Sequence, residues 1–151
     1  DPFIVLEDAD LEAAVRGAKG RRYAFGNEFD VSLCNTHEGH LRATTPIDVF
    51  PGGATPEGLV DMTGNVWDWT LSLWGRDRNR IDDRYRYPYR ADEGREDVSA
   101  DAGCARVLRG GSWRDFQDTA RAAFRFNFLP AFRGDDYGFR VVRAAPNFPG
   151  L

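Results

Sequence analysis

The part of the sequence that most constrains the fold is one run from Arg106 to Arg143. Near its start it contains Arg-Gly-Gly-Ser-Trp and at its end Gly-Phe-Arg-Val-Val-Arg, both typical of strands that meet tight turns. Between these ends lie six phenylalanines and tyrosines: Phe116, Phe124, Phe126, Phe128, Phe132 and Tyr137. The chain must therefore hold an aromatic segment between two fixed strands, as a core, a catalytic site or a binding surface.

Outside this run, local patterns predict few regular elements and many loops. The apolar spacing over Asp8–Arg16 predicts a short amphipathic helix, which Asp8 can cap and Gly17 can end. Residues 76–101 carry charges of both signs and predict a long surface loop with Arg–carboxylate pairs. The strands that we expect cover residues 65–74, 105–113 and 138–143. Scarce helix and abundant loops favour an α+β fold with long ordered loops.

Length and composition limit the functions open to the chain. Its 151 residues suit one domain, and 42% hydrophobic residues suffice for a core. A net charge of −4 argues against a general nucleic-acid binder, which needs a basic face. No apolar run reaches the length needed to cross a bilayer and no signal peptide is recognisable, so we expect the cytoplasm by default.

The two cysteines, Cys34 and Cys104, are far apart and belong to no CxxC pattern. They predict two free thiols rather than a disulfide framework or a zinc site.

Several blocks of the sequence together carry a family resemblance. In order, they are LEAAVRGAKGRRYAFGNEFD, LCNTHEG, TTPIDVFPGG, GLVDMTGNVWDWT, RVLRGGSW and YGFRVVR. They resemble the formylglycine-generating enzyme (sulfatase-modifying factor) family from Val5 to Arg143. The resemblance implies one α+β domain over residues 1–151 with a variant of the C-type lectin fold. We expect a small antiparallel sheet, few helices and long ordered loops, with residues 76–101 as an insertion and the N-terminal part of the family domain absent.

The same resemblance argues against the family's oxidase chemistry. Its oxidase members bind copper through two cysteines shortly after the Gly-Gly-Ser-aromatic block, and soft thiolates suit Cu(I). The matching positions hold Asp115 and Ala120, so we expect neither copper nor formylglycine synthesis. No serine or cysteine lies in a recognisable nucleophile turn.

Two alternatives to a binding protein remain open. One is half of an iron enzyme like those that make ergothioneine precursors, whose final loop the run FRFNFLPAFR loosely resembles. It would need a partner domain for its iron, because only His37 and His40 are present, both in a turn-rich segment. The other is a structural module of a larger signalling or defence protein, with no ligand of its own.

The resemblance also implies a structural calcium ion. Its ligands would be side-chain oxygens of Asp61 and Asp68 and backbone carbonyls of Gly64 and Val66. Calcium takes six to eight hard oxygens, and a glycine-containing turn can aim carbonyls inward. The alternative is that Asp61 only caps a turn.

The aromatic run also resembles the variable proteins of diversity-generating retroelements. These proteins have a C-terminal Gly-Gly-Ser-Trp…Gly-Phe-Arg segment in which scattered positions, often asparagine codons in the template, are rewritten by adenine-directed mutagenesis. Most occupants here are reachable from such codons, Gln117 being an exception. We expect about half of this set to be core and half to be exposed to a protein or other macromolecular ligand. The predicted surface is Arg114, Asp115, Phe116, Gln117, Asp118, Phe124, Phe126, Asn127, Phe128, Phe132, Asp135, Asp136 and Tyr137.

Within the run, other residues are predicted to be scaffold. Arginines should hold neighbouring loops through carbonyl and carboxylate hydrogen bonds. The scaffold set is Arg121, Arg125, Pro130, Arg133, Gly138 and Phe139.

Overall fold

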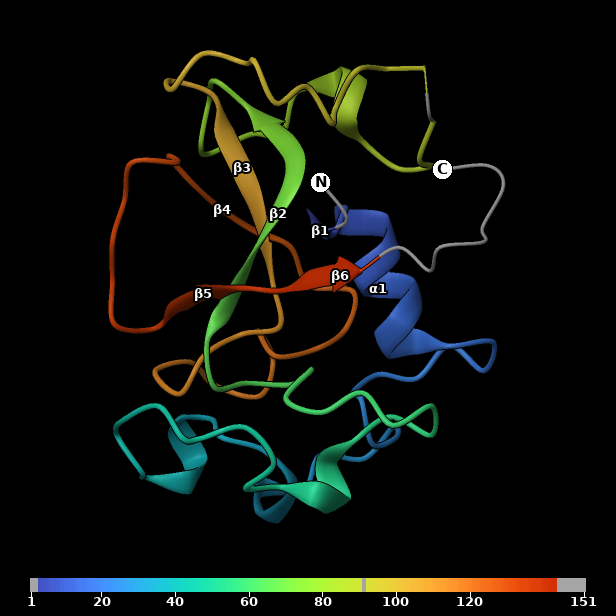
Figure 1. The fold of residues 1–151 in the computed structure, drawn as a ribbon, viewed down its shortest axis with the longest axis vertical. Coiled ribbons are helices and arrows are strands. Elements are labelled where there is room, and N and C mark those ends of the chain that lie inside the picture. The colour runs from blue at the N-terminus through green and yellow to red at the C-terminus, as the bar shows by residue number, and fades with distance from the viewer. Residues whose placement is uncertain (1–2, 91, 144–151) are drawn as a thin grey trace.

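The computed structural model describes residues 3–90 and 92–143, which form one helix, six short strands and four single-turn 3₁₀ helices amid long loops (Figure 1). The helix and strands are β1 (Phe3–Val5), α1 (Asp8–Arg16), β2 (Trp67–Gly75), β3 (Ala105–Arg109), β4 (Phe126–Phe128), β5 (Tyr137–Phe139) and β6 (Val141–Arg143). The 3₁₀ helices are η1 (Val31–Leu33), η2 (His37–Gly39), η3 (Pro51–Gly53) and η4 (Asp83–Tyr85). No helix among these residues is long and apolar enough to cross a membrane.

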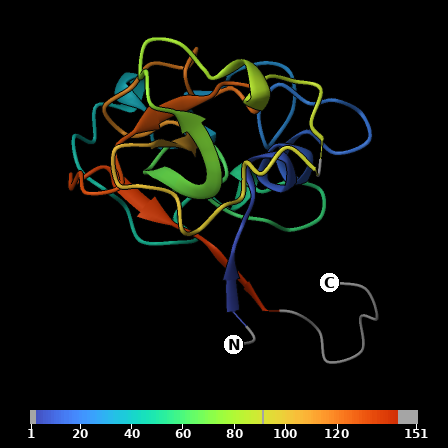
Figure 2. The same cartoon turned by 90° about the horizontal axis from the view of Figure 1, so that it is seen from above.

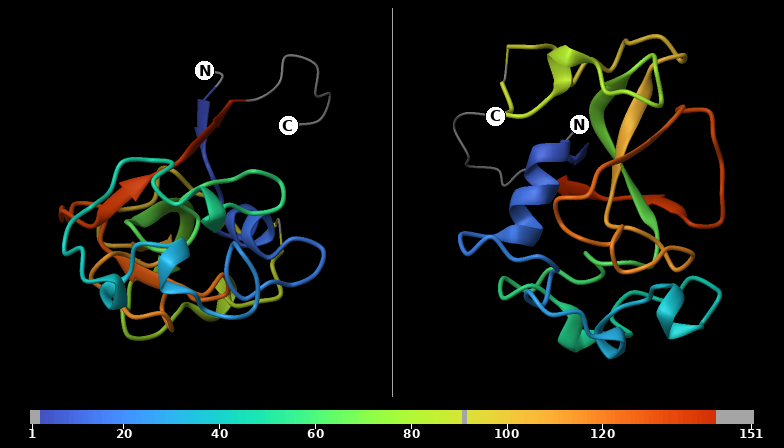
Figure 3. Two further views of the ribbon diagram at one scale, coloured as in Figure 1. Left: turned by 90° about the horizontal axis from the view of Figure 1, so that it is seen from below. Right: turned by 180° about the vertical axis from the view of Figure 1, so that it is seen from behind.

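A four-stranded sheet in the order β4-β3-β2-β5 forms the centre of the fold. The pairs β2–β3 and β3–β4 are antiparallel, whereas β5 runs parallel to β2, so the sheet is mixed rather than wholly antiparallel. The antiparallel pair β1–β6 projects from this body as a separate ribbon (Figure 2). The irregular loops between α1 and β2 gather at one end of the molecule (Figure 3). The predicted α+β class with long ordered loops is confirmed.

Glycines and one arginine set the strand boundaries. β3 ends at Arg109 because Gly110 and Gly111 follow with φ of 93° and 75°, which other residues rarely adopt. The predicted strand at 138–143 is two strands, because Arg140 leaves the ladder and its Nε donates to Asp68 (2.6 Å).

The helix forms where the sequence predicts it, but Asp8 does not cap it. The residue at the N-cap is Glu7, which makes no side-chain cap hydrogen bond, and the helix ends at Gly17. Leu11 and Val15, four residues apart, are both buried in the core. Asp8 is fully buried, so its carboxylate faces the interior instead of the helix end.

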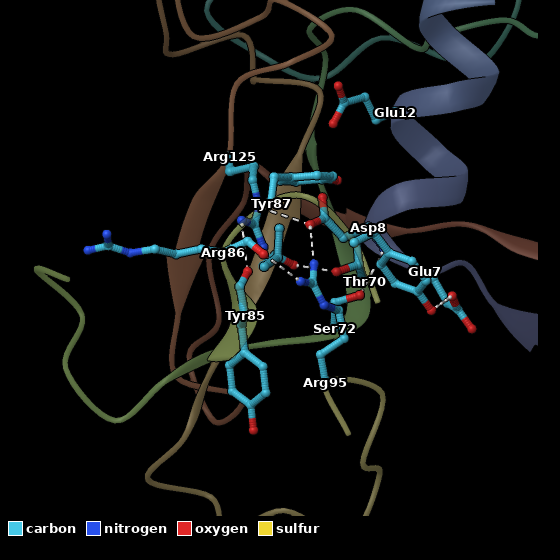
Figure 4. A network of polar contacts seen from close by, with 12 residues as sticks. Glu7, Asp8, Glu12, Thr70, Ser72, Tyr85, Arg86, Tyr87, Arg95 and Arg125 are labelled. Atoms are coloured by element: carbon cyan, nitrogen blue, oxygen red, sulfur yellow. Dashed lines mark hydrogen bonds and ion pairs between the residues drawn. The ribbon is translucent and has the colours of Figure 1, made fainter. Parts of the chain in front are cut away.

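Three arginines surround the Asp8 carboxylate: Arg95 and Arg109 are buried and Arg125 is half-buried. Figure 4 shows Arg95 and Arg125 beside Asp8. Arg109 Nε donates to its Oδ1, and Arg109 Nη2 donates to Glu12 (2.7 Å). Arg125 Nε lies 2.9 Å from Asp8 Oδ2 without hydrogen-bond alignment, and Arg95 Nη1 lies 4.0 Å from the same oxygen. This network joins α1, β3, the charged loop and the aromatic run, so it links segments distant in the sequence.

Residues 76–101 are not entirely a surface loop, because Arg95 is buried. Exposed ion pairs such as Arg80–Asp83 (2.7 Å) and Arg84–Asp82 (3.0 Å) fit the predicted surface loop. Arg95, however, is fully buried and bonds to Glu93. Arg95 therefore anchors the described part of the loop in the interior, where its charge pairs with Glu93 and lies near Asp8.

Both cysteines are free thiols, as predicted. Burial raises the pKa of Cys34 to about 12, so this thiol stays protonated and unreactive at neutral pH.

Candidate ligand-binding surface

Four aromatic side chains, Phe126, Phe128, Phe132 and Tyr137, form a continuous cluster that we call the aromatic ridge. Successive ring centroids lie 6.3 Å apart (Phe126–Phe128), 4.0 Å (Phe128–Phe132) and 5.1 Å (Phe132–Tyr137). These spacings suit tilted and edge-to-face aromatic contacts. The ridge therefore unites β4, the loop after it and the start of β5.

Two tryptophans of β2 pack against the ridge. Trp67 lies 5.1 Å from Phe126 and Trp69 lies 6.0 Å from Tyr137, measured between ring centroids. Phe124 packs against the Trp67 ring at 6.1 Å and is half-buried. β2 therefore supplies a rigid base for this surface.

The ridge lies at the surface, not in the core. Phe132 is 37% exposed, and Phe126, Phe128 and Tyr137 are half-buried. Phe116, in the loop before β4, is 58% exposed. A structural module would bury these rings, so their exposure favours a binding role.

Phe116 lies against η2 rather than against the ridge. Its ring centroid is 4.4 Å from that of His37, whose main-chain N–H donates to the Asp115 carbonyl (2.9 Å). Glu38 accepts a hydrogen bond from the Gln117 N–H (2.8 Å). His37 and His40 are both exposed. η2 therefore holds the first part of the predicted surface in place.

A polar cluster lies between Phe116 and the ridge. Asp115, at the first of the two matched copper-cysteine positions, accepts hydrogen bonds from Trp67 Nε1 (2.8 Å) and from the Ser112 hydroxyl. That hydroxyl is also 3.1 Å from Asp136 Oδ2. Because a hydroxyl carries one proton, it can donate to only one of the two carboxylates. Both contacts of the Ser112 oxygen are hydrogen bonds only when one of the two carboxyl groups is protonated and donates to it.

Asp136 suits that donating role. Burial raises the pKa of Asp136, although the Ser112 hydrogen bond and the Arg114 charge oppose the shift. The main-chain carbonyl of Asp136 accepts the Trp67 N–H (2.8 Å), which fixes its position.

We expect Asp136→Asn to become more stable relative to the wild type as the pH rises from about 4 to 7. A carboxyl with a raised native pKa costs stability above the unfolded value near 3.8, as the pH rises toward the native pKa. The amide cannot ionise and can still donate to Ser112. Urea midpoints across this range measure the effect, with Asp135→Asn as the control. The same trend in both variants would contradict the assignment.

The predicted surface residues differ in exposure: two are buried, and the others are half-buried or exposed. Asn127 is 5% exposed and its amide donates to the Arg78 carbonyl (3.0 Å), because strand alternation turns it away from Phe126 and Phe128. Asp136 is also buried. Arg114 and Asp135 pair with each other at the exposed surface (2.7 Å). Asp115 and Gln117 are half-buried, and Asp118 is exposed.

The predicted scaffold set contains one error. Arg125 bonds to the Tyr85 carbonyl (3.4 Å) and to the Asp8 network, as expected of scaffold. Phe139, in contrast, is 68% exposed and lies on the edge strand β5.

One residue of the surface comes from the charged loop and was not predicted. Arg78 places its guanidinium carbon 3.7 Å from the Phe128 ring centroid, a cation–π contact. Nothing near Arg78 in the sequence indicates this partner, which lies 50 positions away in the numbering.

The residues implied for calcium lie in the turn before β2 and, for Asp68, at the start of β2 itself. Asp68 accepts from Arg140 Nε, and Arg140 also donates to the carbonyls of Val60 (3.0 Å) and Asp61. Burial raises the pKa of both Asp61 and Asp68, and the Arg140 charge opposes each shift. Arg140 thus supplies one positive charge to two desolvated carboxylates.

Two features show that these residues fit a further cation. Asp61 Oδ2 is buried and has no hydrogen-bond partner among the described residues. A Cβ atom added at Gly110 would lie 3.9 Å from the carbonyl oxygens of Met62 and Val66 and 4.0 Å from Asp68 Oδ2. Oxygens therefore line a small space beside Gly110, and Asp61 adds an unpartnered carboxylate oxygen to the same turn. Both features suit a hard ion. The described residues hold no cluster of three or more His, Cys, Asp or Glu side chains placed to bind a metal, so carbonyls would have to complete the site.

The mixed sheet, long ordered loops and aromatic ridge define a C-type lectin-like domain of the formylglycine-generating-enzyme type. Comparison with known proteins agrees: the family model "Sulfatase-modifying factor enzyme 1-like domain" matches residues 5–145. The chain belongs to this family.

Relatives in the family differ in what they do. The chain is 34% identical to the serine/threonine-protein kinase pkn1 of Chlamydia caviae, covering 87% of this chain and 19% of the kinase. It is 31% identical to the inactive C-alpha-formylglycine-generating enzyme 2 of Bos taurus, covering 95% of this chain and 44% of that protein. A hercynine oxygenase of Mycolicibacterium thermoresistibile is 33% identical, covering 70% of this chain and 23% of the oxygenase. The chain spans less than half the length of each of these relatives.

Solved structures share the fold. Treponema denticola variable protein 1 superposes with a TM-score of 0.69 at 23% identity, covering 92% of this chain and 46% of that one. PvdO from Pseudomonas aeruginosa gives a TM-score of 0.65 at 26% identity, covering 95% and 53%.

Proposed function

We propose that the chain is a non-catalytic binding module whose aromatic ridge contacts a protein or other macromolecular ligand. The observation that carries this proposal is the exposure of a connected aromatic cluster on a rigid strand. Rigid rings flanked by Arg and Asp side chains supply contact area with little loss of conformational entropy. The absence of thiols at the Asp115 and Ala120 positions supports a role without copper chemistry. Ala120 is buried and Asp115 is bonded within the fold.

The finer form of the proposal is a retroelement-diversified variable protein. Its support is the position of the Gly-Gly-Ser-Trp and Gly-Phe-Arg motifs and the residue types between them. The shared fold with a solved variable protein is consistent with it. Sequencing the locus tests this form directly. An adjacent near-repeat of the DNA that encodes residues 106–143, together with a reverse transcriptase gene, would support it. A gene with neither feature nearby would contradict it.

The binding role itself is tested by a display library. The library randomises Phe116, Phe126, Phe128, Phe132 and Tyr137, and selection is against a folded target such as lysozyme. We expect most members to fold, and target-specific binders to emerge. A matched library randomises five exposed positions outside this surface: Arg76, Asp77, Val98, Ser99 and Asp101. The proposal fails if most members of the first library unfold, or if the two libraries give binders equally often.

The kinase relatives favour a second candidate, a module that forms part of a larger signalling protein. The chain matches only 19% of the Chlamydia caviae kinase. Such a module would have no ligand of its own, so a library at its exposed rings would give no more binders than the control.

Asp61 and Asp68, with the carbonyls of Gly64 and Val66, are the residues that would hold calcium. The ion would neutralise two desolvated carboxylates and fix the turn before β2. We expect saturating calcium to raise the Tm by about 5–10 °C, since ligand at 100 times its Kd adds about 2.7 kcal/mol.

Asp61→Asn is the variant that tests the calcium site, because Asp61 Oδ2 has no hydrogen bond to lose within the part of the chain that the structure describes. We expect it to fold and to lose the calcium response. Magnesium at the same concentration is the control ion. Equal shifts with both ions, or no shift with calcium, would remove the site from the proposal.

A further inference from the structure

A pocket of about 530 Å³ lies beside the aromatic ridge, between β2, β5 and the loop before β5. Trp69, Phe132, Tyr137 and Phe139 contribute its aromatic lining. Trp69 and Phe139 are register partners in the parallel β2–β5 pair. This volume is typical of small-molecule sites, and the ring-rich lining suits a planar apolar group.

The charge of the pocket is opposite to that of the chain. Its lining includes Arg106 and Arg133 and no aspartate or glutamate, although the net charge of the chain is −4. Arg106 is committed to the fold, because it donates to the carbonyls of Leu71 and Asp97. A small anion would therefore find a local positive field here.

Arg133 is the group that remains available for a ligand. It is exposed, and its hydrogen bonds within the described residues run from Nη1 to the carbonyls of Pro130 and Phe132 (both 2.9 Å). No carboxylate of the described residues forms an ion pair with it. Its Nε and Nη2 groups can thus donate to a carboxylate, the bidentate partner that guanidinium geometry favours.

We propose that this pocket binds a small aromatic carboxylate, whose ring packs among the aromatic side chains and whose carboxylate pairs with Arg133. The site shares Phe132 and Tyr137 with the ridge but does not depend on a macromolecular ligand. It does not include Phe126, and the rings that Phe126 contacts, Trp67 and Phe128, do not line it either, so the two sites can be separated by mutation.

Isothermal titration with 1-naphthoate, 1-naphthamide and 1-naphthylmethylamine tests the proposal. We expect saturable binding of the acid, about tenfold weaker binding of the amide, and the weakest binding of the amine, because a hydrogen bond between charged groups is stronger than one to a neutral group. Arg133→Gln should lower affinity for the acid about tenfold and leave the amide unchanged. Phe139→Ala, at an exposed position, should weaken both ligands.

Two control variants sharpen the result. Arg76→Gln removes an equal charge from an exposed site outside the pocket and should leave all three affinities unchanged. Phe126→Ala changes a ridge residue whose ring contacts Trp67 and Phe128, neither of which lines the pocket, so it should also leave the three affinities unchanged. A loss of macromolecular binding in this variant would therefore be seen separately from any change at the pocket. Equal affinities for acid and amide, equal losses in the Arg133 and Arg76 variants, or no saturable binding would overturn the assignment.

Discussion

Asp8→Ala is expected to lower the free energy of unfolding by about 3–5 kcal/mol, since removing one partner leaves buried charges uncompensated. The carboxylate of Asp8 is fully buried against Arg109 and Arg125, with Arg95 close by. Its loss would leave the guanidinium groups of three segments without their shared partner. Urea unfolding followed by tryptophan fluorescence measures the change.

Asp10→Ala is the matched control for this experiment. Asp10 lies in the same first turn of α1 but is exposed, so its loss should cost less than about 1 kcal/mol. Similar losses in the two variants would show that the Asp8 network contributes little to stability.

Gly64→Ala is expected to be the most damaging small substitution in the turn before β2. Gly64 has a φ of 78°, and an added Cβ would lie 2.3 Å from the Asn35 carbonyl oxygen. That oxygen cannot easily move, because it accepts the Asn65 N–H (2.7 Å). We expect a loss of at least about 3 kcal/mol, combining left-handed strain of 1–2 kcal/mol with the steric clash.

Gly58→Ala separates the two contributions. Gly58 has a φ of 87° but no atom within 4 Å of an added Cβ, so only the strain applies there. Thermal unfolding of both variants gives the difference. If Gly58→Ala is as damaging as Gly64→Ala, the close approach to Asn35 is not what requires glycine.

Local patterns in the sequence predicted α1, β2 and β3, whereas β1 and β4 were not among the predicted strands. The spacing of Leu11 and Val15 placed α1 correctly. Family motifs identified the turn before β2 and the aromatic run. These features depend on near neighbours in the chain, which is why one sequence contains them.

Local sequence patterns could not predict side-chain contacts between residues that are far apart in the chain. Asp8 looks like a helix cap because caps and buried ion-pair partners use the same residue, and its partner Arg109 is 101 positions away. Asn127 was expected at the surface because a polar residue between aromatics suggests one, whereas its amide bonds to the Arg78 carbonyl. The contact of Arg78 with Phe128 likewise requires the folded loop.

The main-chain hydrogen bonds around the binding surface have a consequence for how freely its side chains can change. The N–H groups of His37 and Trp67 bond to the carbonyls of Asp115 and Asp136, and Phe132 N–H bonds to the Leu129 carbonyl. Bonds of this kind form whatever side chain each residue carries, proline as a donor excepted. These main-chain bonds therefore hold the segments in place independently of their side chains. Exposed side chains on this surface can change while the backbone conformation is kept.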